Sequence, residues 1–149
     1  MTLEELLEKE AIKELRVNYS YCYDGMMVDE LVDLFTDDAI CEFGPDFGGD
    51  WVGKEAIKTN FAMFTATEGV PFGILHAITN PMIRLIDDTT AHGRWYMHDL
   101  ITMEGVEHPP IFYGIYDDVY KKVSGEWKFY RTRIDFLWPK RQVSSPRVF

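Results

Sequence analysis

Residues 76–99 constrain the fold of this chain more than any other stretch, because they have the pattern of a β-hairpin. Pro81 enters the first strand, Asp87 and Asp88 mark the turn, and a second strand runs from about residue 90 to residue 103. Because side chains alternate between the two faces of a strand, one face of the second strand is apolar except for a single carboxylate. That face carries Gly93, Trp95, Met97, Asp99, Ile101 and Met103.

Two polar residues on the apolar faces of this hairpin are candidates for function. Asp99 lies among Trp and Met side chains, where a charge is costly unless it finds a partner or takes up a proton. His76 interrupts the first strand in the same way, since it alternates with Ile74 and Ile78. On pattern alone the ordinary interpretations are favoured, in which His76 is a core histidine bonded to a backbone carbonyl and Asp99 caps a turn.

The length and composition favour one domain with a large aromatic content. A chain of 149 residues is long enough to bury a core, and we expect a single domain over residues 1–139 followed by a tail over residues 140–149. Hydrophobic residues make up 46% of the chain and aromatic residues 15%. Such a surplus suits both a tight core and a cavity for a ring-shaped ligand, and composition does not separate the two.

The charge and the cysteines bound the location and the partners. The net charge of -10 repels phosphate backbones, so nucleic acid is not an expected partner. No run of about 18 apolar residues occurs, and the N-terminus is acidic, unlike that of a signal peptide. Cys22 and Cys41 have neither CxxC spacing nor the pattern of a disulfide framework. The sequence therefore predicts a cytoplasmic protein with reduced cysteines and no membrane partner.

Three helices are expected in the first half of the chain. Apolar residues recur at spacings of three and four over residues 3–23, and Thr2 with Glu5 forms a capping box at the start. This helix is expected to end near Gly25, which tolerates the left-handed conformation. The second helix covers residues 27–35 and the third covers residues 54–67.

Strands dominate the second half. A short strand over residues 39–43 precedes the loop GPDFGGDW, whose three glycines and proline predict irregular structure and a possible pocket rim. The later strands cover residues 72–79, 82–85, 90–103, 111–123 and 126–138, with a turn at Ser124-Gly125. This order predicts an α+β fold, in which helices close a curved antiparallel sheet into a cone with an apolar pocket. The basic tail, KRQVSSPRVF, is expected to lie across a neighbouring subunit or to be disordered.

Several segments together resemble one family. The run AIKELRVNYSYCYDGMMVDEL, an isolated strand histidine, TTAHGRWYMHD and FYGIYDDVYKKVSGEWKF are similar to the SnoaL-like cone superfamily. This superfamily includes scytalone dehydratase, bile-acid 7-alpha-dehydratase, ketosteroid isomerase and nuclear transport factor 2. The resemblance covers about residues 5–138 and is closest to the bile-acid dehydratase branch.

The resemblance implies four site residues. In that branch a tyrosine and an aspartate near the end of the first helix, a strand histidine and an aspartate after a GRWY motif form the active site. The matching positions here are Tyr19, Asp24, His76 and Asp99. The loops around Phe47 and Glu68 depart from the dehydratase, so its substrate does not carry over.

The implied activity is that of a hydro-lyase without a cofactor, acting on a hydrophobic polycyclic or aromatic hydroxy-ketone. Histidine suits proton abstraction near neutral pH, and we expect His76 to be the base with Asp24 bonded to its far ring nitrogen. Tyr19 is expected to donate to the developing enolate, while Asp99 polarises the substrate as a neutral acid or bonds Tyr19 or His76. Because five helical residues turn the chain by about 500°, Asp24 faces the same way as Tyr19 only if the helix has ended before it.

Two other functions stay open at this point. A ketosteroid-isomerase-like enzyme would move a proton without elimination, and a binding or oligomerisation module of the same fold would catalyse nothing. Metal chemistry is a weaker alternative, because His92, His98, Asp99 and His108 lie close in sequence. On a strand, however, His98 and Asp99 point to opposite faces, so no metal site is expected.

The outer face of the sheet predicts self-association. It is expected to expose Tyr96, Leu100 and other apolar groups, and such faces favour contact between subunits. We expect a homo-oligomer, and a trimer rather than a dimer. Light scattering at micromolar concentration measures the mass directly, and a value near the 17.4 kDa of one chain would contradict the prediction.

Overall fold

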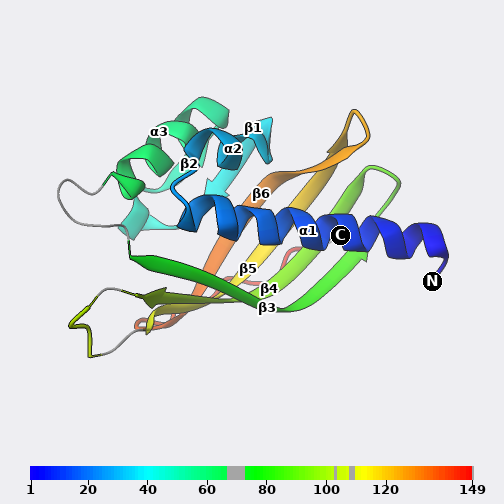
Figure 1. Cartoon of the computed structure of the whole chain (residues 1–149). Helices are drawn as coiled ribbons and strands as arrows, with labels where there is room; N and C mark the ends of the chain where they lie inside the picture. Colours follow the sequence, from blue (N-terminus) through cyan, green and yellow to red (C-terminus); the bar gives the residue numbers. More distant parts are fainter. Residues whose placement is uncertain (67–72, 103, 108–109, 149) are drawn as a thin grey trace.

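The computed structural model describes residues 1–66, 73–102, 104–107 and 110–148, and over these it has the α+β architecture expected from the sequence (Figure 1). Its elements are α1 (Leu3–Asp24), α2 (Val28–Asp33), β1 (Phe35–Glu42), a 3₁₀ turn (Pro45–Phe47), β2 (Asp50–Val52), α3 (Lys54–Thr65), β3 (Ile74–Leu85), β4 (Thr90–Ile101), β5 (Pro110–Val123) and β6 (Glu126–Trp138). The strands form one sheet in the order β2-β1-β6-β5-β4-β3. Strands β3 to β6 are antiparallel, whereas β1 runs parallel to β6, which the sequence did not predict.

Helix α1 covers the sheet because one stripe of it is buried. Its start has the predicted capping box, in which Thr2 Oγ1 accepts from the Glu5 backbone N–H at 3.1 Å and a Glu5 carboxylate oxygen accepts from the Thr2 backbone N–H at 2.7 Å. The helix lies along strands β3 to β6, and α2 and α3 pack at the end of the sheet formed by β1 and β2 (Figure 1). None of the helices in the described ranges has the length and apolar character needed to cross a membrane.

Several element boundaries differ from those predicted. Helix α2 ends at Asp33 because Phe35 already pairs with β6, so the expected helix over residues 27–35 is too long. Gly25 has φ -83°, and Met26 is the residue with a left-handed φ of 55°. The loop after β1 was expected to be irregular, but it contains the 3₁₀ turn and strand β2.

The hairpin of β3 and β4 confirms the predicted faces. Strand β3 is continuous, with a register shift between Thr79 and Met82 and a left-handed φ of 55° at Asn80. The predicted strand ends at residues 72 and 103, and the helix end at residue 67, lie outside the described residues. On the outer face Tyr96 is 46% exposed, and self-association through that face stays a prediction.

The C-terminal tail lies on the outer face of its own sheet. The Gln142 N–H donates to the Phe136 carbonyl at 2.8 Å, and the Ser144 N–H donates to Asp135 Oδ1 at 3.1 Å. Arg147 Nε lies 3.2 Å from Oδ1 of the fully buried Asp117. This arrangement differs from both of those expected, because the tail carries the cations that outer-face carboxylates need when they are buried.

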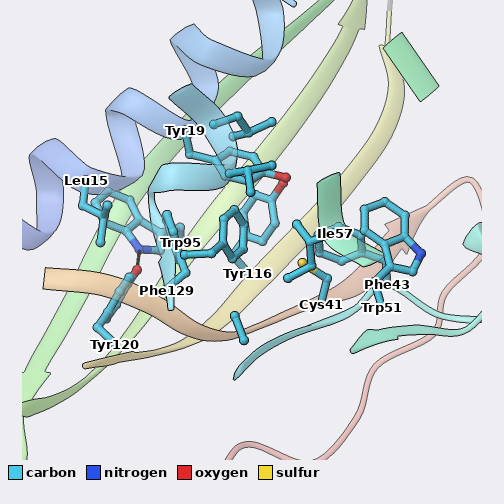
Figure 2. Close-up of a cluster of buried hydrophobic side chains, with 14 of the residues drawn as sticks. Leu15, Tyr19, Cys41, Phe43, Trp51, Ile57, Trp95, Tyr116, Tyr120 and Phe129 are labelled. Carbon is cyan, nitrogen blue, oxygen red and sulfur yellow. Dashed lines mark hydrogen bonds between the residues drawn. The ribbon is translucent and has the colours of Figure 1, made fainter. Parts of the chain in front are cut away.

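A buried ion pair forms the floor of the cone. Arg16 is fully buried, and its Nη2 lies 3.0 Å from Asp118 Oδ1 and 3.1 Å from the Thr132 hydroxyl. The guanidinium carbon lies 3.3 Å from the centroid of the Tyr116 ring, within the range of a cation–π contact. The Tyr120 hydroxyl donates to Asp118 Oδ2 at 2.7 Å. Figure 2 shows the surrounding cluster and the hydrogen bond from Trp95 to Tyr120, which measures 3.0 Å.

We expect Arg16→Met to lower the free energy of unfolding by about 3 to 5 kcal/mol, because it leaves the Asp118 carboxylate buried without its partner. Urea denaturation followed by circular dichroism measures this change. The matched control is Lys13→Met on the same helix, where the pair with Glu10 is partly exposed and worth at most about 1 kcal/mol. Equal stability of the two variants would contradict a structural role for the buried pair.

Candidate active site

The register of the β3–β4 hairpin places His76 directly opposite Asp99. Both side chains are on the inner face, where His76 is 8% exposed and Asp99 is 7% exposed. His76 Nδ1 lies 3.0 Å from Asp99 Oδ1. The sequence singled out both residues as misplaced polar groups, and the structure brings them into contact.

Asp24 holds the backbone of His76 rather than its ring. Both Asp24 carboxylate oxygens accept from the His76 backbone N–H, at 3.0 and 3.1 Å, whereas the nearest Asp24 oxygen is 3.9 Å from His76 Nδ1. The predicted bond from Asp24 to the ring nitrogen is therefore wrong, and the carboxylate oxygen nearer to that nitrogen belongs to Asp99, at 3.0 Å. The helix continues through Asp24, so its side chain turns toward the free edge of β3 instead of following Tyr19.

The edge position of β3 explains the close contact of the pair. The His76 N–H points away from β4, toward Asp24, so His76 and Asp99 are opposite residues of the non-hydrogen-bonded kind. In an antiparallel sheet such residues have closer Cα atoms and closer side chains than hydrogen-bonded pairs. Capture of the N–H by Asp24 is consistent with the short distance between the imidazole and the Asp99 carboxyl.

Three tyrosine rings surround the pair. Tyr19 is 2% exposed and its ring centroid lies 6.2 Å from that of His76. Tyr23, one helical turn later, makes an edge contact with His76 at 4.6 Å. Tyr116 on β5 packs against Tyr19 with centroids 6.0 Å apart. Sequence reasoning missed Tyr23 and Tyr116, although the spacing of four from Tyr19 to Tyr23 was a signal that both face the sheet.

The site opens into a small aromatic cavity. The volume is about 40 Å³, enough for one water molecule and far below the roughly 300 to 1,000 Å³ of a typical ligand pocket. The lining residues are Tyr19, Tyr23, Phe43, Phe47, Trp51, Phe61, Phe64, His76, Met97, Asp99, Phe112, Tyr116, Ile134 and Phe136. The predicted apolar cavity is thus present with Tyr19, His76 and Asp99 in its wall, but side chains fill most of it. Asp24 is not among the lining residues.

Burial sets the protonation of the pair. Burial, with a smaller contribution from the Asp24 charge, raises the pKa of Asp99 to about 8. Burial, with a smaller contribution from Arg16, lowers the pKa of His76 to about 3. At neutral pH a neutral imidazole therefore faces a protonated carboxyl group. Burial also raises the pKa of Tyr19 well above its ordinary value, so this phenol remains a hydrogen-bond donor.

The histidines considered as metal ligands do not meet at this site. His92 Nε2 lies 2.9 Å from Asp117 Oδ1, on the outer face of the sheet. His98 Nε2 lies 3.2 Å from the Thr79 hydroxyl, on the face opposite to Asp99. Within the described ranges no group of three or more His, Cys, Asp or Glu side chains is arranged to hold a metal ion. His108 lies outside these ranges.

Comparison with known proteins gives one family match and many structural neighbours. Residues 4–133 match the SnoaL-like domain family. A protein from Novosphingobium aromaticivorans, provisionally named a scytalone dehydratase, is 30% identical, with 91% of this chain and 88% of that chain covered and a TM-score of 0.78. An NTF2-like protein with a cystatin-like fold from the same species is 17% identical, with 93% and 87% covered and a TM-score of 0.76.

A hexachlorocyclohexane dehydrochlorinase, LinA type 2, is 16% identical, with 98% of this chain and 96% of that chain covered and a TM-score of 0.72. At this identity the likeness shows the fold alone, as it does for the NTF2-like protein. The predicted resemblance to SnoaL-like proteins is confirmed, and the closer likeness to the bile-acid dehydratase branch stays a prediction.

The two shifted pKa values predict a pH dependence of stability. The ordinary pKa values are 3.8 for the carboxyl group and 6.5 for the imidazole. Between these values the proton on Asp99 of the folded state makes stability fall as pH rises, whereas the proton on His76 of the unfolded state makes stability rise with pH. The two effects therefore oppose each other in this range. Above pH 6.5 only Asp99 contributes, and the stability from its raised pKa is lost as pH rises through about 8.

We expect the free energy of unfolding to fall by about 1 to 2 kcal/mol between pH 6.5 and 8 in the wild-type protein, and this slope to disappear in Asp99→Asn. Urea denaturation across this range measures the slope. Asp88→Asn, in the exposed hairpin turn, is the control and should keep it. A slope that persists in Asp99→Asn would assign the effect to another group.

Proposed function

Because this chain belongs to the SnoaL-like domain family, we propose that it is a cofactor-independent dehydratase acting on a hydrophobic, aromatic or polycyclic hydroxy-ketone. The observation that carries the proposal is the buried contact of 3.0 Å between His76 Nδ1 and Asp99 Oδ1 in the wall of an aromatic cavity. A core histidine needs only a backbone partner, whereas this arrangement joins a base to an acid of raised pKa. The 30% identity to the protein provisionally named a scytalone dehydratase also supports elimination chemistry.

The protonation of the pair defines two working forms. When the pair has lost its proton, His76 Nδ1 donates to the Asp99 carboxylate and Nε2 is free to accept a proton from substrate. When the pair holds its proton, Asp99 can donate to Nδ1, so that Nε2 carries a hydrogen and can act as an acid. The rate of proton abstraction should therefore rise with pH through about 8, the pKa of Asp99, rather than through the ordinary imidazole value of 6.5.

The reaction follows from these forms. His76 Nε2 removes a proton from the carbon beside the carbonyl, and the C–H electron pair forms an enolate whose oxygen accepts a hydrogen bond from a phenol, with Tyr19 as our candidate. The enolate then re-forms the carbonyl and expels the hydroxyl from the next carbon. The imidazolium returns its proton to that hydroxyl, so water leaves and the base is restored. The bile-acid dehydratase branch, with its four matching residue types, is part of this proposal.

A second function is favoured by a different observation. The cavity of about 40 Å³ does not admit a polycyclic ketone as it stands, which favours a binding or assembly module without catalysis. Isomerisation remains the alternative within the same chemistry, since it needs the proton transfer but no leaving group.

Proton abstraction can be tested before the substrate is known. 2-Tetralone is an aromatic bicyclic ketone without a hydroxyl leaving group, and in D₂O a base in the site exchanges its protons beside the carbonyl for deuterium. We expect exchange above the buffer rate, with His76→Ala lowering it by about a hundred- to ten-thousandfold. No exchange above buffer, or equal exchange by His76→Ala, would contradict the proposal and favour the binding module. Hydroxy-ketones then separate the enzymes by mass, because only dehydration loses water.

Double variants test which carboxylate works with His76. Asp99→Asn should lose nearly as much exchange as His76→Ala, and the double variant should lose no more than either, because the two act as one unit. Asp24→Asn should lose less, since an amide oxygen can still accept from the His76 backbone N–H. Multiplicative losses for His76→Ala with Asp99→Asn would show independent action and overturn the assignment.

A further inference from the structure

The ring of Phe47 lines the cavity and is partly exposed. It stacks on Phe136 with centroids 5.9 Å apart and an angle of 5° between the ring planes. Phe64 at 5.5 Å and Phe112 at 6.2 Å contact it at steeper angles. Phe47 is partly exposed and its neighbours Asp46 and Gly48 are exposed, so this ring lies between the cavity and solvent.

The segment that carries Phe47, residues 44–49, is bonded mainly within itself. The Phe47 and Gly49 N–H groups both donate to the Gly44 carbonyl at 3.1 Å. Gly44 has φ 88° and ψ 177°, and Gly48 has φ 84°, conformations that other residues rarely adopt. The Phe47 carbonyl accepts from Trp51 Nε1 at 2.9 Å. Because few bonds join this segment to the sheet, it can move as a unit when that bond breaks.

A surface hollow adjoins the cavity. Its volume is about 370 Å³, within the range of ligand pockets, and Gly44 and Pro45 line it. Phe43, Ile134 and Phe136 line both the hollow and the cavity. Phe47 lines the cavity, and Gly44 and Pro45 of the same segment line the hollow, so residues 44–49 border both spaces.

We propose that the Phe47 ring stands in the place of a planar aromatic ring of the substrate, and that residues 44–49 move outward to admit it. This inference rests on the proposed function and narrows its substrate class to molecules with a flat aromatic ring. Phe47 is then a residue that determines specificity, because a ligand must replace its stacking on Phe136 and its contacts with Phe64 and Phe112. A saturated ring of the same carbon skeleton cannot stack in this way.

The competition between Phe47 and a ligand has a measurable consequence. When only a small fraction of the protein is in the state that binds, the apparent dissociation constant equals the intrinsic one divided by that fraction. Truncating Phe47 removes the competing ring and leaves a cavity lined by apolar side chains, and such cavities of about 150 Å³ stay dry and bind benzene. Aromatic ligands should then bind more tightly.

The probe is 2-naphthol, a flat bicyclic phenol, and its saturated counterpart decahydro-2-naphthol is the matched ligand. We expect Phe47→Ala to bind 2-naphthol about tenfold more tightly than the wild-type protein by calorimetry, with a smaller gain for decahydro-2-naphthol. If Phe47→Ala does not fold, Phe47→Leu takes its place, because it is a milder change that keeps an apolar side chain. The affinity of Phe47→Leu for 2-naphthol should rise by less than that expected for Phe47→Ala. Tyr96→Ala, which removes an aromatic ring from the outer face, should bind as the wild-type protein does.

The motion is tested in the wild-type protein. Saturation with 2-naphthol should shift the indole N–H resonance of Trp51, identified by its absence in Trp51→Phe, because the bond to the Phe47 carbonyl breaks. The proposal is overturned if neither Phe47 variant binds 2-naphthol more tightly than Tyr96→Ala does. It is also overturned if the affinity for decahydro-2-naphthol rises as much as the affinity for 2-naphthol, or if the Trp51 signal is unchanged at saturation. Binding of 2-naphthol needs no proton abstraction, so it is measured independently of the exchange of 2-tetralone. If 2-tetralone is not exchanged but 2-naphthol binds as expected, the replacement of Phe47 by a flat ring stands and the substrate class falls with the dehydratase proposal. If 2-naphthol does not bind as expected, the dehydratase proposal stands.

Discussion

The site depends on the hydrogen bond from the His76 backbone N–H to the Asp24 carboxylate, because this contact joins the end of α1 to the free edge of the sheet. An edge strand leaves alternate backbone N–H groups without a strand partner, and a carboxylate is a strong acceptor for one of them. With its N–H turned toward the helix, His76 faces Asp99 as a closely spaced cross-strand pair. One bond thus positions the helix, the strand edge and the imidazole together.

The buried ionisable groups at the floor of the cone and at the candidate site avoid an unpaired charge in different ways. At the floor, Arg16 and Asp118 are both fully buried and neutralise each other, and Thr132 and Tyr120 each add one hydrogen bond to the pair. At the site, His76 and Asp99 are both uncharged at neutral pH, because burial lowers the pKa of the imidazole and raises the pKa of the carboxyl group. The first arrangement keeps two paired charges, whereas the second holds two neutral groups whose pKa values burial has shifted. The acid and base chemistry that we propose requires groups with shifted pKa values.

The aromatic content that marks the sequence serves two purposes in the structure. Tyr19, Tyr116 and Phe129 pack around the Arg16 guanidinium and exclude water from the floor. Nearer the surface, Phe47 and Phe136 stack and reduce the cavity to about 40 Å³. The same residue type thus packs the core around Arg16 and lines the cavity, where we propose that a substrate ring replaces Phe47. The two groups of aromatic residues differ in the backbone that carries them. Phe129 belongs to strand β6 inside the sheet, whereas Phe47 belongs to a short segment with glycines on both sides.

The sequence by itself determined the α+β cone, the hairpin faces, and His76 with three residues that lie near it, because strand alternation and the family resemblance are local or patterned properties. It did not determine which carboxylate contacts the imidazole ring. That choice depends on where α1 ends relative to the free edge of β3, and a helix end and a strand edge 52 residues apart meet only in the folded chain. The sequence did not reveal the burial of Arg16 for the same reason. A charged residue in a helix resembles a surface position, and its partner Asp118 lies 102 residues away in the chain. The volume of the cavity was also decided only by the tertiary structure, because it is the small space left after many side chains from separate elements have packed.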